Sequence, residues 1–266
     1  MRTTNFLSGF GKFVLALSLT GALGACALAP KDDPDALAEY KAANDPFEPA
    51  NRLVFAANSA VDAFILQPIA VIYRDLAPDE LKPPFENLIT NLFMPISFIH
   101  ALLQGDLERA EMAAQRFVGS LPTLLLGDPM PNKPPVHEDA GQTLGVWGVE
   151  AGPYVMLPIL GPSNMRDTTG VIIDFFVDPV RYLGQTRWSI GRGASDAVID
   201  RSKNIDTVRD LQRNSLDYYA AVRSPYRQRR EAQIVNGDVR NEQPAPTIGL
   251  ESESVKNAVA IKPGSN

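Results

Sequence analysis

The stretch "GPYVMLPILGPSNMRD", residues 152–167, is apolar at its centre and yet crowded with residues that interrupt regular structure. Proline removes a backbone donor and glycine weakens a strand, so neither a long helix nor a central strand is expected here. The interrupting residues are Gly152, Pro153, Pro158, Gly161 and Pro162. Soluble proteins rarely carry so apolar a loop across their surface. The rest of the chain must indicate which solvent this segment meets.

Residues 1–25 predict a signal peptide that ends at a lipid-attachment site. Arg2 and Lys12 supply positive charge, and the uncharged run that follows is shorter than the roughly 20 residues of a spanning helix. The run ends in "LGAC", which resembles a bacterial lipobox and contains Cys26, the single cysteine of the chain. We expect Cys26 to carry the lipid; the alternative is an ordinary secretory signal followed by a chance cysteine. Ala27 resembles an outer-membrane sorting signal.

Composition and charge divide the mature chain into three parts. Residues 26–44 predict a flexible tether that starts at the lipidated cysteine, and residues 237–266 have the composition of a disordered tail. One folded helical domain is expected over residues 45–236. The formal net charge of −6 argues against general affinity for nucleic acid, which needs a basic surface. Basic residues gather instead over residues 181–230.

The folded part predicts an all-α protein made of short amphipathic helices that proline and glycine interrupt. Residues 52–66 place apolar side chains on one face, and the pair Gln67 and Pro68 is expected to end or kink that helix. Residues 87–104 contain no Asp, Glu, Lys or Arg. Because Pro95 interrupts them, two short helices that meet there are favoured over one membrane span.

The later helices follow the same pattern. Asp106 is a plausible N-cap for a helix over residues 106–126, and a short helix with Phe175 and Phe176 is expected to stop at Asp178. The apolar stripes of such helices have two interpretations. They can form the single core of a helical globule, or some of them can lie in a membrane interface beside the lipid anchor.

The sequence offers little catalytic chemistry. It contains no G-x-S-x-G nucleophile elbow, no P-loop and no G-x-G-x-x-G fingerprint. Two histidines, His100 and His137, do not make a metal constellation, so no metal or other cofactor is expected. A lipid hydrolase that uses a serine with His137 stays open as a less favoured alternative, because sequence neighbours do not establish the required geometry.

Four stretches together resemble one family. They are "NDPFEPANRLVFAAN" at residues 44–58, "LLQGD" at 102–106, "EDAGQTLGVWGVEAGPYVMLPILGPSNMRD" at 138–167 and "SLDYYAAVRSPYRQRREAQIVNG" at 215–237. They are similar to the MlaA (VacJ) lipoproteins of the bacterial outer membrane, over nearly the whole folded part and in the family's order. The segment 119–135 departs from the family pattern, in which an Asn-Thr pair and a glycine-rich turn are common.

The resemblance implies a fold and a function. It implies a ring-like assembly of amphipathic helices with an irregular Gly/Pro-rich apolar segment, lipid-anchored in the periplasmic leaflet of the outer membrane of a diderm bacterium. Trimeric porins would lie beside it. A central channel would let mislocalised phospholipid leave the outer leaflet and reach a soluble periplasmic lipid carrier, which maintains lipid asymmetry. No enzymatic activity is implied. A porin-associated scaffold that conducts no lipid is the main alternative.

Two groups of residues are candidates for contact with lipid or partners. Polar residues are expected at the channel lining or at helix contacts, and apolar residues of the opening stretch at the channel wall or its gate. These candidates are Asn51, Arg52, Asn58, Asn87, Asn91, Tyr154, Met156, Leu157 and Pro158. A basic cluster could meet lipid phosphates or an acidic protein, or form a solvated helix face. It consists of Arg223, Arg227, Arg229 and Arg230.

Overall fold

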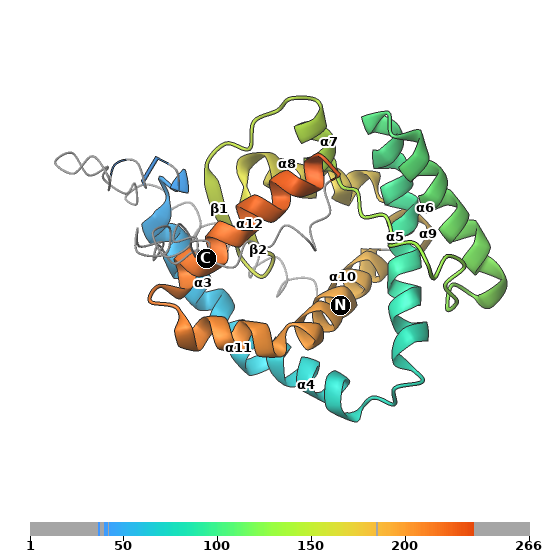
Figure 1. Cartoon of the computed structure of the whole chain (residues 1–266), viewed down its shortest axis with the longest axis horizontal. Coiled ribbons are helices and arrows are strands. Elements are labelled where there is room, and N and C mark those ends of the chain that lie inside the picture. The colour runs from blue at the N-terminus through green and yellow to red at the C-terminus, as the bar shows by residue number, and fades with distance from the viewer. Residues whose placement is uncertain (1–36, 38–39, 42, 185, 237–266) are drawn as a thin grey trace, which may run out of the picture.

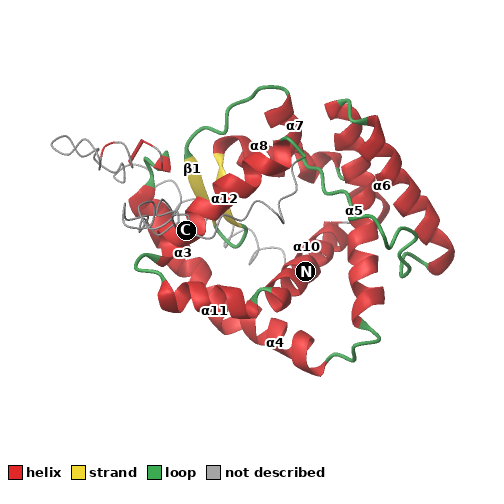
Figure 2. Cartoon of the chain, in the orientation of Figure 1, coloured by secondary structure: helices red, strands yellow, loops and turns green. Residues whose placement is uncertain are grey.

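The computed structural model describes residues 37, 40–41, 43–184 and 186–236. Helices dominate this part of the chain, and its two strands form one antiparallel hairpin (Figure 2). The predicted all-α, ring-like class is therefore confirmed. The predictions for the signal peptide, Cys26 and the tail after residue 236 lie outside the described residues. Of the few described residues of the predicted tether, all but Asn44, which lies in a turn, are helical.

The described elements follow in the order α3 Glu48–Val61, η1 Asp62–Leu66, α4 Gln67–Leu76, α5 Lys82–Gln104, α6 Leu107–Ser120, η2 Leu121–Thr123, α7 Ala140–Val146, β1 Tyr154–Leu157, β2 Gly161–Asn164, α8 Met165–Val177, α9 Pro179–Gly184, α10 Thr186–Lys203, α11 Ile205–Asn214 and α12 Tyr218–Ile234. Figure 1 shows them arranged around a ring. Within it, α5 packs on α6 and α7 on α8, while α10 contacts α4, α5 and α9. The ring closes where β1 packs on α3 and where α12 reaches α7 and β2.

The first helix does not end at the expected point. α3, η1 and α4 form one helical stretch over Glu48–Leu76, so of the two outcomes expected at Gln67 and Pro68, an end or a kink, the end is wrong. The intervening element is a π-helical turn, and Pro68 follows it in the first turn of α4. A π-turn shifts the hydrogen-bond ladder, so the helix can pass a proline whose ring and missing N–H would otherwise obstruct the ladder. The chain therefore continues as a helix with an internal irregularity.

α5 is a second correction. The two short helices expected to meet at Pro95 are one helix, with Pro95 inside it. Buried residues on both sides of the proline, among them Met94 and Ile96, anchor the helix against its neighbours. Packing of this kind offsets the lost hydrogen bond. The helix ends at Gly105, whose φ of 78° is left-handed.

The ends of the later helices agree with most predictions. Asp106 is the N-cap of α6, since its Oδ1 accepts a hydrogen bond from the backbone N of Arg109 at 3.0 Å. α6 nevertheless stops at Ser120, before the expected residue 126, and a short 3-10 turn follows. α8 ends at Val177, directly before Asp178, where the stop was predicted.

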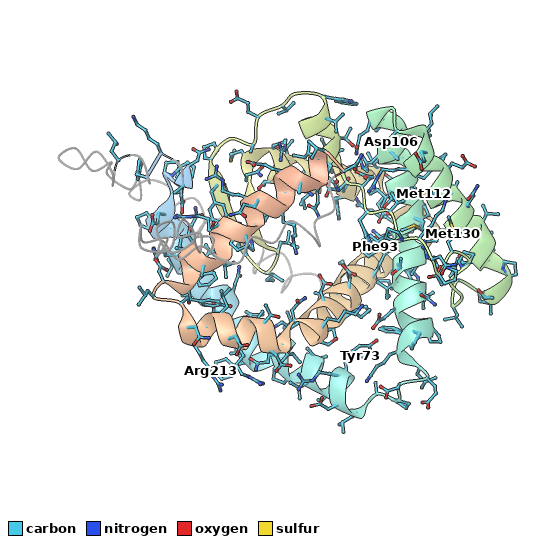
Figure 3. All side chains as sticks on the ribbon, viewed as in Figure 1. Tyr73, Phe93, Asp106, Met112, Met130 and Arg213 are labelled. Carbon is cyan, nitrogen blue, oxygen red and sulfur yellow. The ribbon has the colours of Figure 1, made fainter. Side chains whose placement is uncertain are left out.

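Two small apolar clusters form the interior instead of one large core. The first lies between α5 and α6 around Met94, Ala113 and Val136, and Figure 3 labels its neighbours Phe93 and Met112. The second, around Tyr154, Met156 and Tyr219, joins the hairpin to α3 and α12. Apolar stripe residues of the first helix stay outside both clusters. Leu53, Phe64 and Ile65 are exposed.

Candidate lipid-contact site

The stretch "GPYVMLPILGPSNMRD" forms the hairpin and the start of α8. β1 pairs with β2 from Tyr154 opposite Asn164 to Leu157 opposite Gly161. Ile159 in the turn and Gly161 at the start of β2 are left-handed, with φ of 69° and 85°. A hairpin was not expected from the sequence, because its two strands are only four residues long and proline lies in and beside them.

Asn51 fastens β1 to α3. Its Nδ2 donates to the backbone O of Tyr154 at 3.1 Å, and its Oδ1 accepts from the backbone N of Met156 at 2.9 Å. The same Nδ2 donates to Oδ1 of Asp45 at 2.7 Å. The amide thus pairs with the free edge of β1 as a neighbouring strand would. Asn51 is buried, so its place is at a contact between elements.

Asn58 holds the hairpin turn in the same way. Two helical turns after Asn51, its Nδ2 donates to the backbone O of Leu157 at 2.9 Å and its Oδ1 accepts from the backbone N of Ile159 at 2.8 Å. Asn44 completes the series at the other end, since its Nδ2 donates to the backbone O of Gly152 at 2.8 Å. Three asparagines spaced by seven residues therefore hold the hairpin segment in place through hydrogen bonds to its backbone.

The apolar candidates of this segment divide into two pairs. Tyr154 and Met156 are almost fully buried in the second apolar cluster, and burial raises the pKa of the Tyr154 phenol. Leu157 is half-buried and Pro158 is exposed. Only the second pair therefore lies where a lipid could reach it without repacking of the core.

Asn87 and Asn91 lie one turn apart on α5 and support the loop that follows α6. Asn91 Nδ2 donates to the backbone O of Leu125 at 2.8 Å and to that of Gly127 at 3.0 Å. Asn87 Nδ2 donates to the backbone O of Leu126 at 3.1 Å. Both side chains are therefore engaged with protein backbone.

Arg52 joins α3 to the start of α12. Its guanidinium pairs with Asp217 and with Glu48, and it lies over the ring of Tyr219, 4.6 Å from the centroid. The hydrogen bond with Asp217 is the main reason that the pKa of Arg52 is raised. The group is partly exposed, so the pairs are modest in energy.

Two of the four basic candidates on α12 are internal ion-pair partners. Arg223 Nη1 lies 2.8 Å from Oδ2 of the buried Asp45. Arg230 lies 2.6 Å from Asp139 and 2.8 Å from Asp167. Burial alone would raise the pKa of Asp139, but the hydrogen bonds and charge of Arg230 hold it below its ordinary value.

Tyrosines on the same stripe of α12 extend these contacts. Tyr219 donates to Asp45, and Tyr226 Oη donates to Oδ2 of Asp167 at 2.6 Å. Burial, and then the carboxylate partner, raise the pKa of both phenols. Of the other two basic candidates, Arg227 is half-buried and Arg229 is exposed. The basic cluster is thus partly a fastening between α12 and the rest of the ring.

The histidines do not form a recognisable catalytic or metal site. His100 is buried, with Nδ1 3.0 Å from Oγ1 of Thr143 and Nε2 2.8 Å from Oδ1 of Asp174. His137 is exposed. Within residues 43–184 and 186–236, no group of three or more His, Cys, Asp or Glu side chains is placed to hold a metal ion.

Sequence reasoning missed the extent of the exposed apolar surface. The helical stretch Glu48–Leu76 is long and apolar enough to cross a membrane by length and composition, and its most apolar part is almost entirely unburied. Phe64 is 83% exposed and Leu76 is 75% exposed. Apolar residues lie on both sides of Pro68 in the sequence. The end or kink expected at that proline divides them into two short segments, so one long apolar helix was not predicted.

Comparison with known proteins agrees with this architecture. The family model that matches the chain is described as MlaA lipoprotein and covers residues 43–233. The intermembrane phospholipid transport system lipoprotein MlaA of Escherichia coli is 30% identical over 225 residues, which is 80% of this chain and 87% of that protein. An uncharacterized protein of Rickettsia typhi is 33% identical over 196 residues, 71% of this chain and 78% of its own length.

A solved structure is similar as well. It comes from work on the structural basis for maintenance of bacterial outer membrane lipid asymmetry, and it matches with a TM-score of 0.61 and 32% sequence identity. The match covers 71% of this chain and 98% of the solved one. Sequence model, named relatives and fold agree, and the chain belongs to the MlaA lipoprotein family.

Proposed function

We propose that this protein takes mislocalised phospholipid from the outer leaflet of the outer membrane through the centre of its ring and passes it to a periplasmic carrier. The main support for this proposal is the unburied apolar face of the helical stretch Glu48–Leu76. Water disfavours so much contiguous apolar surface, whereas acyl chains cover it without cost. The relatives named for intermembrane phospholipid transport support the same role.

The physical task is to lower a solvation barrier. Transfer of an acyl chain from the bilayer into water costs about 0.8 kcal/mol of free energy per CH₂, so a chain of about 16 carbons faces a barrier of roughly 10 kcal/mol. A protein that shields the tails while it admits the polar head removes most of this barrier without chemical catalysis. We therefore assign the protein a transport role with no catalytic residues and no cofactor.

The proposal gives different roles to the candidate residues. Leu157 and Pro158 are the apolar residues of the hairpin that we place at the lipid path, because they are not fully buried. We propose that Asn58, on α3, positions the hairpin turn through its two hydrogen bonds to the backbone of that turn. Arg229, which is exposed on α12, is proposed to meet a lipid phosphate or an acidic partner.

The cellular setting is part of the proposal. Lipidated Cys26 would hold the ring in the periplasmic leaflet of the outer membrane, beside a trimeric porin. The soluble carrier would approach from the periplasm and receive the phospholipid. More than one acyl chain on the lipidated residue would make this anchoring durable.

Deletion of the gene tests the proposal. We expect phospholipid to accumulate in the outer leaflet and detergent sensitivity to rise, and we expect the full-length protein to reverse both effects. Unchanged surface phospholipid after deletion would contradict lipid transport. A protein that co-purifies with porin while surface phospholipid stays normal would instead be a scaffold.

A further inference from the structure

Residues 117–127, which span the last turn of α6, η2 and the start of the Pro-rich connection, form an apolar protrusion that we call the leucine knuckle. It carries no charged side chain. Leu124 at its tip is 79% exposed. The other exposed large apolar residues of the knuckle are Val118, Leu121 and Leu126. Most of the knuckle belongs to the segment in which this chain departs from the sequence pattern of its relatives.

The backbone of the knuckle is strained. Leu124 and Leu125 are consecutive left-handed residues, with φ of 55° and 67°. For a residue with a β-carbon this conformation costs about 1 kcal/mol or more. Such strain persists only where the surroundings impose it, so contacts from neighbouring elements must hold these two leucines.

Contacts with two helices, α5 and α6, hold the backbone of the knuckle in this conformation. From α5, the Asn91 side chain, 1% exposed, donates to the backbone oxygens of Leu125 and Gly127, and Asn87 donates to that of Leu126. From α6, Gly119 allows a close approach, since a β-carbon there would lie 2.9 Å from Cβ of Pro129. The leucines are therefore held in one preformed arrangement.

The backbone donors of the knuckle are also internally paired. The N–H groups of four consecutive residues at its tip each donate to an acceptor within the knuckle. The pairs are Leu124 N to Leu121 O at 3.0 Å, Leu125 N to Ser120 O at 2.9 Å, Leu126 N to Thr123 O at 3.1 Å and Gly127 N to Thr123 Oγ1 at 2.9 Å. Hydrocarbon requires this of any non-helical backbone, because no water is present to accept the hydrogen bonds.

Charged groups lie at the base of the knuckle. The Arg116 side chain is almost fully buried, pairs with Asp128, and donates to the backbone oxygens of Met130 and Lys133 at 3.0 and 2.7 Å. The protrusion is thus apolar at its tip and ionic at its base. A segment that inserts into a bilayer has this polarity.

We propose that the leucine knuckle inserts into the acyl chains of a phospholipid bilayer, with Asn87 and Asn91 as its positioning residues. A protein partner fits less well, because the tip offers no charge and its four N–H groups are already paired. The inference rests on the membrane location in the proposed function but not on lipid conduction. Insertion gives the ring a fixed depth at a point distant in sequence from its lipid anchor.

A fluorescent label at the tip tests the insertion. The full-length lipidated protein with Leu124→Cys, labelled with an NBD fluorophore, is reconstituted into phosphatidylethanolamine and phosphatidylglycerol vesicles. Asn132→Cys is the matched control, because it is exposed in the same connection but lies beyond the Arg116–Asp128 pair. The parent chain, whose one cysteine is Cys26, gives the background labelling.

Nitroxide lipids give the readout. We expect acyl-chain nitroxides to quench most of the Leu124 signal and to leave the Asn132 signal nearly unchanged. A Leu124 label that emits as in water and is quenched only by an aqueous quencher would overturn the proposal. Protection of Leu124 that arises only after porin is added would overturn it as well, because the occupant would then be a protein.

Asn91→Leu tests the positioning role. The substitution keeps the side-chain size but removes both hydrogen bonds to the knuckle, so the tip label is expected to lose much of its acyl-chain quenching while helix content stays unchanged. Undiminished quenching would contradict the role. If this variant fails to fold, Asn87→Leu, which removes one hydrogen bond, provides the same comparison. Lipid transfer is measured separately: insertion without transfer refutes the proposed function and leaves this inference intact.

Discussion

At the scale of single residues, Asn51 makes three hydrogen bonds, and two of them join α3 to a segment far away in the chain. Two of them reach β1, more than 100 positions away, and the third reaches Asp45. We expect Asn51→Leu to lower the free energy of unfolding by about 3 kcal/mol, because it leaves buried backbone groups without partners. Denaturant unfolding in detergent, followed by circular dichroism, measures this.

Asn132 provides the control for that measurement. It is exposed, so Asn132→Leu should change the free energy of unfolding by no more than about 0.5 kcal/mol. Equal effects of the two substitutions would show that the asparagine contacts with β1 contribute little.

Arg230 and Arg229 are adjacent in sequence but differ in environment. The Arg230 side chain is mostly buried between Asp139 and Asp167, with 12% of it exposed, whereas Arg229 is exposed. Removing one partner of a buried ion pair costs roughly 3–5 kcal/mol, so Arg230→Met should destabilise the protein strongly and Arg229→Met should not. Thermal unfolding of the two variants distinguishes them. Similar melting temperatures would contradict the fastening role of Arg230.

The Arg230 contacts also predict a pH dependence. The folded-state pKa of Asp139 lies below the ordinary 3.8, so its stabilising contribution is present at neutral pH and is lost as the pH falls through the folded-state pKa. Without Arg230 this pKa is no longer depressed. The stability difference between the wild type and Arg230→Met should therefore shrink below about pH 4. A difference that stays constant into acid would refute the linkage.

At the scale of elements, the first helix shows which features of a helix the local sequence pattern predicts and which it does not. Its apolar periodicity predicts a helix at the correct place, and the N-cap at Asp106 and the stop at Asp178 are equally local signals. Its continuation through Pro68 depends on a π-turn, and the continuity of α5 through Pro95 depends on packing against α6 and α7. Neither is encoded in the residues next to the proline, so the predicted break at Pro95 is wrong, and the helix passes Pro68 with an irregularity instead of an end.

Two phenylalanines on this helical stretch give a matched prediction. Phe55 packs on Tyr218 and Tyr219, whereas Phe64 is exposed. Phe55→Ser should lower the free energy of unfolding in detergent by about 2 kcal/mol, since it removes a partly buried ring. Phe64→Ser should leave that free energy nearly unchanged but weaken association with vesicles. Chemical unfolding and vesicle co-sedimentation measure the two effects. Weaker folding with Phe64→Ser and normal vesicle association would reverse the assignment.

At the scale of the whole molecule, the ring closes through contacts that no local pattern predicts. The hairpin reaches α3 through Asn51 and Asn58, and α12 reaches the rest of the ring through Arg223 and Arg230. The sequence marks these residues as polar and concentrated in a few stretches, which is why they are candidate ligand contacts. Their partners lie about 60 to 180 positions away, so only the folded chain distinguishes a fastening from an available side chain.

The central claim is that the ring moves phospholipid, and a reconstituted transfer assay tests it most directly. Vesicles that carry the full-length lipidated protein receive fluorescent phospholipid in the leaflet opposite the anchor, and the soluble carrier is added on the anchor side. We predict that labelled lipid reaches the carrier faster than from protein-free vesicles, and that Asn51→Leu, which unseats the hairpin, alters this rate. Transfer at the protein-free rate, with the protein correctly inserted and folded, would contradict the claim.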